Sequence, residues 1–140
     1  MKFKYRKIPD LQHPLRKWVS RPYLLVNLFH GINMRPVLSL VDSGADYCLF
    51  HSSVGDELGI DLKTGWAKEF GGIAAGQSVQ AYMHTMEIEI QGFGGRVEIE
   101  AGFADSDAIG GLLGGIGFFD NYKVTLEKYK GRIQIEPRRR

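Results

Sequence analysis

The chain has 140 residues, of which 44% are apolar and 24% charged, the composition of one ordinary globular domain. No apolar run approaches the ~18–20 residues of a membrane span. The charged N-terminus is not a secretory signal, so we expect a cytoplasmic protein without a membrane partner. The single cysteine, Cys48, excludes an internal disulfide and zinc sites built on paired cysteines. The four histidines are scattered without metal-ligand spacing, so we expect no metal and no cofactor.

The charge is unevenly distributed along the chain, although the net charge is only +2. Residues 1–41 carry eight Lys or Arg residues and one acidic residue. Residues 42–107 carry three Lys or Arg residues and twelve acidic residues. This pattern favours solvated basic ends, or basic ends docked onto the acidic middle, over a nucleic-acid partner. A nucleic-acid binder stays open as an alternative, because residues 138–140 are all arginine.

The N-terminal segment differs in character from the rest of the chain. Residues 1–20 contain Pro9 and Pro14 and have no clean periodicity. We interpret them as a basic arm that wraps the domain or is partly mobile. The domain itself then covers residues 21–136, and residues 137–140 form a basic tail.

The remaining elements are mostly short strands separated by turns. Eighteen glycines in a chain this short indicate many tight turns. The expected strands cover residues 23–30, 36–41, 47–50, 78–90, 96–101, 124–127 and 132–136. A short helix follows Ser52 or Ser53 as its N-cap, and residues 118–122 form a helical turn. The alternation of apolar and charged residues over residues 86–90 predicts a strand with one solvent-exposed face. We therefore predict an all-β domain with a closed barrel-like or sandwich form and one or two short helices.

The most informative motif is LVDSGAD, residues 40–46, in which Asp42 follows an apolar strand. A buried carboxylate is costly, so such a residue needs a partner or a chemical role. Gly44 and Ala45 are small enough for another backbone to approach closely. Ser43 could hydrogen-bond to a second copy of the same loop. The structural alternative is an ordinary Asx-turn between two strands.

The order of motifs resembles that of the retropepsin-like aspartic proteases, the single-domain, dimeric type found in retroviruses and related cellular proteins. Arg21-Pro22 and a hairpin precede the active-loop motif at residues 41–45. A glycine-rich segment at residues 71–76 resembles the flap. The run Leu112-Leu113-Gly114-Gly115 resembles the turn that supports the active loop, and a short helix and terminal strands follow it. The resemblance covers most of the chain, from residue 21 to residue 136.

This resemblance implies a closed barrel with a flap hairpin and an aspartic endopeptidase activity. Asp42 is then the catalytic residue, and a homodimer supplies the second Asp42, because the mechanism needs two carboxyls and the chain has one such loop. The two carboxyls share a proton and activate a water that attacks an extended peptide or protein substrate. The supporting residues implied are Ser43, Gly44 and Ala45 in the active loop, Gly71, Gly72, Ile73, Ala74, Ala75 and Gly76 in the flap, and Leu112, Leu113 and Gly114 beneath the loop. A plain hairpin turn is the alternative for residues 71–76.

The resemblance also implies an ion pair across the dimer, from Arg21 of one subunit to Asp46 of the other. A surface pair of little energetic value is its alternative. The sequence departs from the family pattern at two places. Gly115 replaces an arginine that braces the loop in many family members, and the segment before Arg21 is longer than in viral members, so the dimer sheet is expected to be built differently.

Other activities are less well supported by the residues. A non-catalytic domain of the same fold, serving as a dimerisation or peptide-binding module, is the main alternative function, and Gly115 is the feature that favours it. Cys48 is better interpreted as a buried small hydrophobe than as a nucleophile. No spacing favours a mechanism that pairs Ser43 or Cys48 with a histidine.

Overall fold

A computed structural model describes residues 1–74 and 77–138 of the chain. Within them lie short helical segments and twelve strands. The helical segments are α1 (Ser52–Glu57), η1 (Leu62–Thr64), η2 (Gly115–Phe119) and η3 (Lys128–Lys130). The strands are β1 (Lys2–Lys4), β2 (Arg6–Pro9), β3 (Trp18–Arg21), β4 (Tyr23–His30), β5 (Asn33–Val41), β6 (Cys48–His51), β7 (Trp66–Ala74), β8 (Gln77–Ile90), β9 (Val97–Ala104), β10 (Leu112–Leu113), β11 (Tyr122–Glu127) and β12 (Arg132–Pro137).

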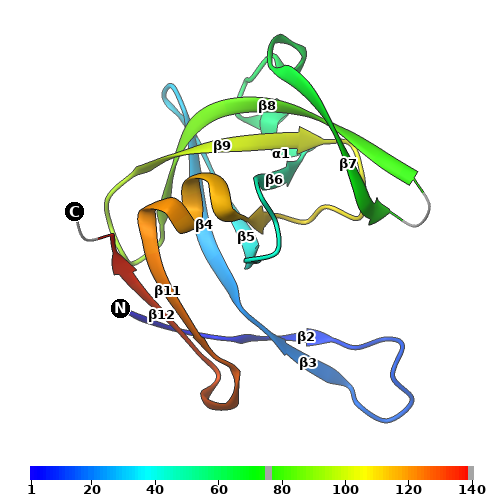
Figure 1. The fold of residues 1–140 in the computed structure, drawn as a ribbon, viewed down its shortest axis with the longest axis vertical. Helices are drawn as coiled ribbons and strands as arrows, with labels where there is room; N and C mark the ends of the chain where they lie inside the picture. The colour runs from blue at the N-terminus through cyan, green and yellow to red at the C-terminus, as the bar shows by residue number, and fades with distance from the viewer. Residues whose placement is uncertain (75–76, 139–140) are drawn as a thin grey trace.

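The main sheet closes on itself. Its strand order is β4-β5-β10-β6-β9-β8-β7, and a further pairing of β4 with β8 completes a ring (Figure 1). The long strand β8 makes this closure possible, because its first part pairs with β7 and its last part with β4. The prediction of an all-β, closed fold with few short helices is confirmed.

Strand alternation places the core inside this ring. On β4, Leu24, Val26 and Leu28 are buried. The predicted alternation at the end of β8 is also confirmed. Ile88 and Ile90 are fully buried, whereas the side chain of Glu87, which precedes Ile88, is exposed. A second, smaller cluster lies around Leu49, Ala81, Met83, Ala104 and Ile109. Tyr47, Phe70 and Leu112 pack against it.

The two predicted helical segments exist with different boundaries. The N-cap of α1 is His51, not Ser52 or Ser53, because the His51 Nδ1 accepts the Ser53 N–H at 3.1 Å. The second segment begins at Gly115, earlier than predicted. It includes Gly117 at a φ of 99°, where a Cβ would lie 2.7 Å from the Cα of Ile99, so only glycine fits.

The first twenty residues have more regular structure than their sequence pattern indicates. β1 pairs with β12, which also pairs with β11, so both ends of the chain meet in a three-stranded sheet. β2 and β3 form a separate two-stranded hairpin that extends away from the ring (Figure 1). The domain boundary at residue 21 stays a prediction. In the described part of the chain, no helix has the length and apolar character needed to cross a bilayer.

Candidate active site

Backbone pairing positions Asp42 at the end of β5. The short strand β10 lies between β5 and β6, with Leu113 in register with Val41. The Asp42 N–H donates to the Leu113 carbonyl at 3.0 Å, and the Val41 N–H donates to the Pro22 carbonyl at 2.9 Å. The start of the Asp42 loop is therefore held from both sides by main-chain bonds.

The loop after Asp42 is a tight turn organised by its own carboxylate. The Gly44 N–H donates to Asp42 Oδ1 at 3.0 Å, and the Ala45 N–H donates to the Asp42 carbonyl at 3.2 Å. This is the Asx-turn geometry that the sequence analysis considered as an alternative. It orients the Asp42 carboxylate, which is half-buried, while the neighbouring Ser43 is exposed.

The segment after β10 supports the loop from below. The Gly115 and Ile116 N–H groups donate to the carbonyls of Ala45 and Asp46, at 2.8 and 2.6 Å. A Cβ on Gly114 would lie 2.3 Å from the Tyr47 carbonyl oxygen, so this close approach requires glycine. The structure thus brings Leu112, Leu113 and Gly114 together with the Asp42 loop.

The Asp42 loop opens onto a cavity of about 310 Å³. Its other walls come from β6, β7 and β10, and its lining residues are Asp42, Gly44, Ala45, Asp46, Tyr47, Leu49, Phe70, Gly71 and Leu112. The Tyr47 and Phe70 rings meet edge to face, with centroids 5.9 Å apart. The Lys68 ammonium lies 5.6 Å from the Tyr47 ring centroid and 5.5 Å from that of Phe70. The carboxylate therefore adjoins an aromatic, apolar wall.

Sequence reasoning missed three of these lining residues, Tyr47, Leu49 and Phe70. Tyr47 and Leu49 are two residues apart, and alternate residues of an extended chain share a face, so this spacing was a usable signal. Phe70 comes from a strand that is distant in sequence, and its position depends on the pairing of β7 with β8.

The predicted flap residues lie at the end of the β7–β8 hairpin. The pairing runs regularly from Trp66 with Met83 to Phe70 with Val79, then shifts register before Ala74 pairs with Gln77. Gly71 lines the cavity. Gly72, Ile73 and Ala74 belong to β7 by their backbone. Ala75 and Gly76 lie outside the described residues.

Arg21 and Asp46 are both exposed and are not joined to each other within the chain. Among the described residues, no salt bridge involves either side chain. A side chain added at Gly115 would begin 3.6 Å from the carbonyl oxygens of Ala45 and Asp46, so this position has room that a larger residue could use. The pair across a dimer stays a prediction.

Cys48 lies beneath the loop and is fully buried. Burial raises the pKa of its thiol to about 11, in spite of a hydrogen bond from the Gly114 N–H. A thiol in this state is a poor nucleophile, which supports its interpretation as a packing residue. Across residues 1–74 and 77–138, no group of three or more His, Cys, Asp or Glu side chains could hold a metal ion.

Comparison with known proteins identifies the fold. No family model and no curated protein matches the chain. Among solved structures, a retropepsin-like aspartic protease from Rickettsia conorii is 20% identical with a TM-score of 0.58, over 79% of this chain and 88% of that one. EIAV protease in complex with the inhibitor HBY-793 is 23% identical with a TM-score of 0.48, over 74% and 88% of the two chains. The retroviral protease-like domain of Ddi1 from Leishmania major is 16% identical with a TM-score of 0.44, over 69% and 73%. The chain therefore has the retropepsin-like fold that its motifs predict.

Proposed function

We propose that the chain is an aspartic endopeptidase that acts as a homodimer, with one Asp42 from each subunit. The observation that carries this proposal is the Asp42 carboxylate, which accepts the Gly44 N–H at the edge of a cavity with an apolar wall, while the Asp42 main chain is held by the Leu113 carbonyl. Each chain supplies one such loop, and the reaction needs two carboxyls. A two-fold axis between the Asp42 loops of two subunits provides both.

The proposed chemistry uses the two Asp42 carboxyls as a coupled pair. Two carboxyls in contact cannot both be ionised, so they share one proton. The carboxyl pair of aspartic proteases is the established example of this effect. The ionised carboxylate takes a proton from a water, and the water oxygen attacks the peptide carbonyl carbon. The protonated carboxyl stabilises the developing oxyanion. The tetrahedral diol then breaks down as a proton reaches the amide nitrogen and the C–N bond breaks, which yields an acid and an amine.

The surrounding elements suit an extended peptide substrate. Tyr47, Leu49 and Phe70 form an apolar wall that fits a large apolar side chain of the substrate. The β7–β8 hairpin, with Gly71, Gly72, Ile73, Ala74, Ala75 and Gly76, acts as a flap that closes over the peptide and excludes water. Its main-chain groups bind the peptide as a strand would.

The proposed dimer also uses Arg21 and Asp46. Arg21 is the last residue of β3, and the carbonyl of the next residue, Pro22, accepts a hydrogen bond from the Val41 N–H beside the active loop. Arg21 of one subunit pairs with Asp46 of the partner subunit, whose side chain is exposed next to the cavity. This pair aligns the two loops about the axis.

Replacement of Asp42 by asparagine tests the proposed function. We expect Asp42→Asn to lower peptide release from a denatured protein mixture at least about a hundredfold, because the amide cannot act as the base. The assay covers about pH 4 to pH 7, where a coupled carboxyl pair changes protonation. Asp56→Asn, on an exposed carboxylate of α1, is the matched control and keeps wild-type activity. Equal cleavage by wild type and Asp42→Asn would contradict the proposal.

A non-catalytic dimerisation or peptide-binding module is the second candidate. The open space at Gly115 favours it, because no side chain from this position braces the Ala45 and Asp46 carbonyls. A dimer in solution without peptide release by either protein would support this second function.

A further inference from the structure

Within the part of the chain that the structure describes, the β2–β3 hairpin has no partner strand. Its two strands pair only with each other within the described residues, and the hairpin extends from the ring of strands (Figure 1). It is attached at its two ends. The Tyr5 N–H donates to the Gly131 carbonyl at 2.8 Å, and the Pro22 carbonyl accepts the Val41 N–H at 2.9 Å. A lone two-stranded hairpin is marginally stable in water, so this element is expected to need a further contact.

The tip of this hairpin is an ordered turn that presents apolar side chains. Asp10 and Arg16 form a salt bridge of 2.8 Å across the tip. His13 Nδ1 accepts the N–H groups of Leu15 and Arg16. Leu11 and Leu15 are nevertheless 92% and 86% exposed. Both leucines are therefore available for contact with another molecule.

The root of the hairpin carries an unusual pair of like charges. Arg6 lies directly opposite Arg21 in the β2–β3 register, and residues opposite each other in antiparallel strands share a face. Like charges in this arrangement destabilise the pairing. Among the described residues, neither arginine has a carboxylate partner. The two guanidinium groups are therefore placed to bind a carboxylate from another molecule.

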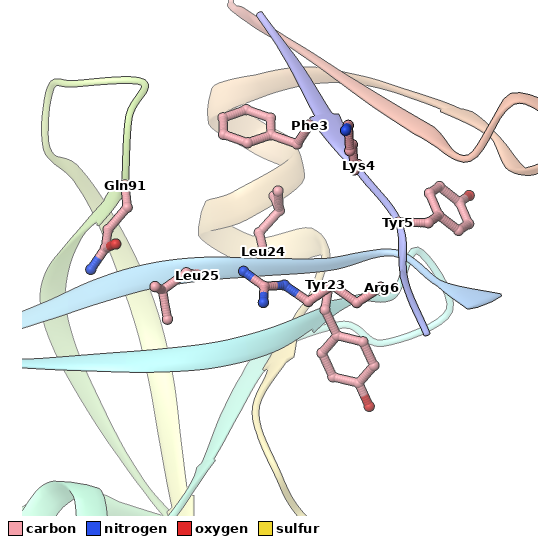
Figure 2. Close-up of a pocket in the computed structure, with 8 residues that line it drawn as sticks. All are labelled: Phe3, Lys4, Tyr5, Arg6, Tyr23, Leu24, Leu25 and Gln91. Atoms are coloured by element: carbon pink, nitrogen blue, oxygen red, sulfur yellow. The ribbon is translucent and has the colours of Figure 1, made fainter. Parts of the chain in front are cut away.

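A groove at this root adds to the same surface. Its volume is about 380 Å³, and Figure 2 shows it between the N-terminal strand segment and β4. Phe3, Tyr5, Tyr23, Leu24 and Leu25 supply its apolar lining. Lys4 and Arg6 also line it, so the groove combines apolar area with positive charge (Figure 2).

We propose that the β2–β3 hairpin is an arm that binds a second copy of this chain, and that Arg6 and Arg21 together hold a carboxylate of that copy. This inference rests on the proposed function, whose two-fold axis passes beside the Asp42 loop. Since Pro22 is bonded to Val41, the root of each arm lies next to that axis. The exposed Asp46 of the partner subunit, which follows the same loop, is one candidate for that carboxylate.

Charge complementarity favours a second copy of the chain as the partner that binds the β2–β3 hairpin. The hairpin carries the cations Arg6, Lys7, Arg16, Lys17 and Arg21, and Asp10, its one acid, is paired with Arg16. Residues 42–107 of the chain carry twelve acids against three bases. The arm projects away from the acidic segment of its own chain (Figure 1), so a second copy offers the acidic surface that it lacks.

Two matched pairs of variants test the arm by sedimentation of the full chain over a range of concentrations. Arg6→Ala is compared with Lys7→Ala, which removes the same charge from the opposite face of β2. The double variant Leu11→Ser/Leu15→Ser is compared with Ile32→Ser, at a fully exposed apolar residue in the β4–β5 turn. We expect each arm variant to raise the dimer Kd at least about tenfold and each control to change it less than about twofold.

Peptide release separates a failure of the arm from a failure of the proposed function. Above the raised Kd, the arm variants should regain wild-type cleavage per dimer, because the arm does not touch the reacting groups. Arm variants that dimerise with the wild-type Kd would overturn the arm, as would a wild-type chain that stays monomeric at every concentration. If the arm variants weaken the dimer while Asp42→Asn cleaves like wild type, the arm stands and the aspartic mechanism is wrong.

Discussion

At the scale of single residues, Gly114 controls how closely the chain after β10 approaches the Asp42 loop. A Cβ at this position would lie 2.3 Å from the Tyr47 carbonyl oxygen and 2.7 Å from that of Ala45. Both are main-chain atoms, which cannot move aside as the end of a side chain can. The hydrogen bonds from Gly115 and Ile116 to the loop depend on this contact.

Gly114→Ala should therefore destabilise the fold by about 1–3 kcal/mol, the usual range for overpacking a filled site. Gly115→Ala is the matched control, since its Cβ would meet the nearest atoms at an ordinary 3.6 Å. It should change stability by less than about 0.5 kcal/mol. Urea unfolding of both variants at one protein concentration checks this, and equal stabilities would refute the steric role of Gly114.

At the scale of elements, one acid organises the β11–β12 hairpin. Glu127 Oε1 accepts from Arg132 at 2.7 and 3.0 Å, and the Lys130 ammonium lies 3.4 Å from Glu127 Oε2. The hydrogen bond from Arg132, followed by that from Lys130, lowers the pKa of Glu127. β12 also pairs with β1, so this hairpin joins the two ends of the chain.

The lowered pKa gives the Glu127 interaction a defined pH dependence. The folded state favours the ionised carboxylate, so the stabilisation is fully present above the ordinary glutamate pKa of 4.5 and is lost as the pH falls through the lower folded value. Glu127→Gln should lower the urea midpoint at pH 7, and the difference from wild type should shrink below about pH 4. Glu136→Gln, whose carboxylate meets Lys123 at 3.6 Å, is the control and should show a smaller change. A pH-independent difference for Glu127→Gln would contradict the ionic origin.

At the scale of the whole molecule, closure of the sheet brings the parts of the site together. β5, β6 and β10 come from three regions of the chain, and the β8 pairings carry β7 over the cavity. The closed ring gives each subunit half of the proposed site. The proposed activity is therefore a property of the dimer.

This dependence predicts how peptide release changes with protein concentration. In the range where most of the chain is monomeric by sedimentation, the rate should rise with about the square of the concentration, since two chains form one site. At concentrations above the dimer Kd the rate should become linear. A linear rate from protein that sediments as a monomer would refute the shared site.

Most of the fold was predictable because its signals are local. The apolar alternation at Ile88 and Ile90 depends on residues two apart, and the Asp42 loop is held in part by its own neighbour Gly44. The N-terminal strands were missed for the opposite reason. β1 is three residues long, and its partner β12 lies at the other end of the chain. The capping role of His51 was missed because serine was the expected cap.

The sequence by itself indicated a mostly β, closed fold and placed Asp42 at a strand end, because these follow from strand patterns and turns. The glycines beneath Asp42 were expected only from the resemblance to a known family. Only the tertiary structure decided that Tyr47 and Phe70 form one wall of the cavity and that Arg6 lies opposite Arg21. Both facts depend on strand register. Register is set by pairings between distant segments, and a shift of one residue would move every side chain to the other face.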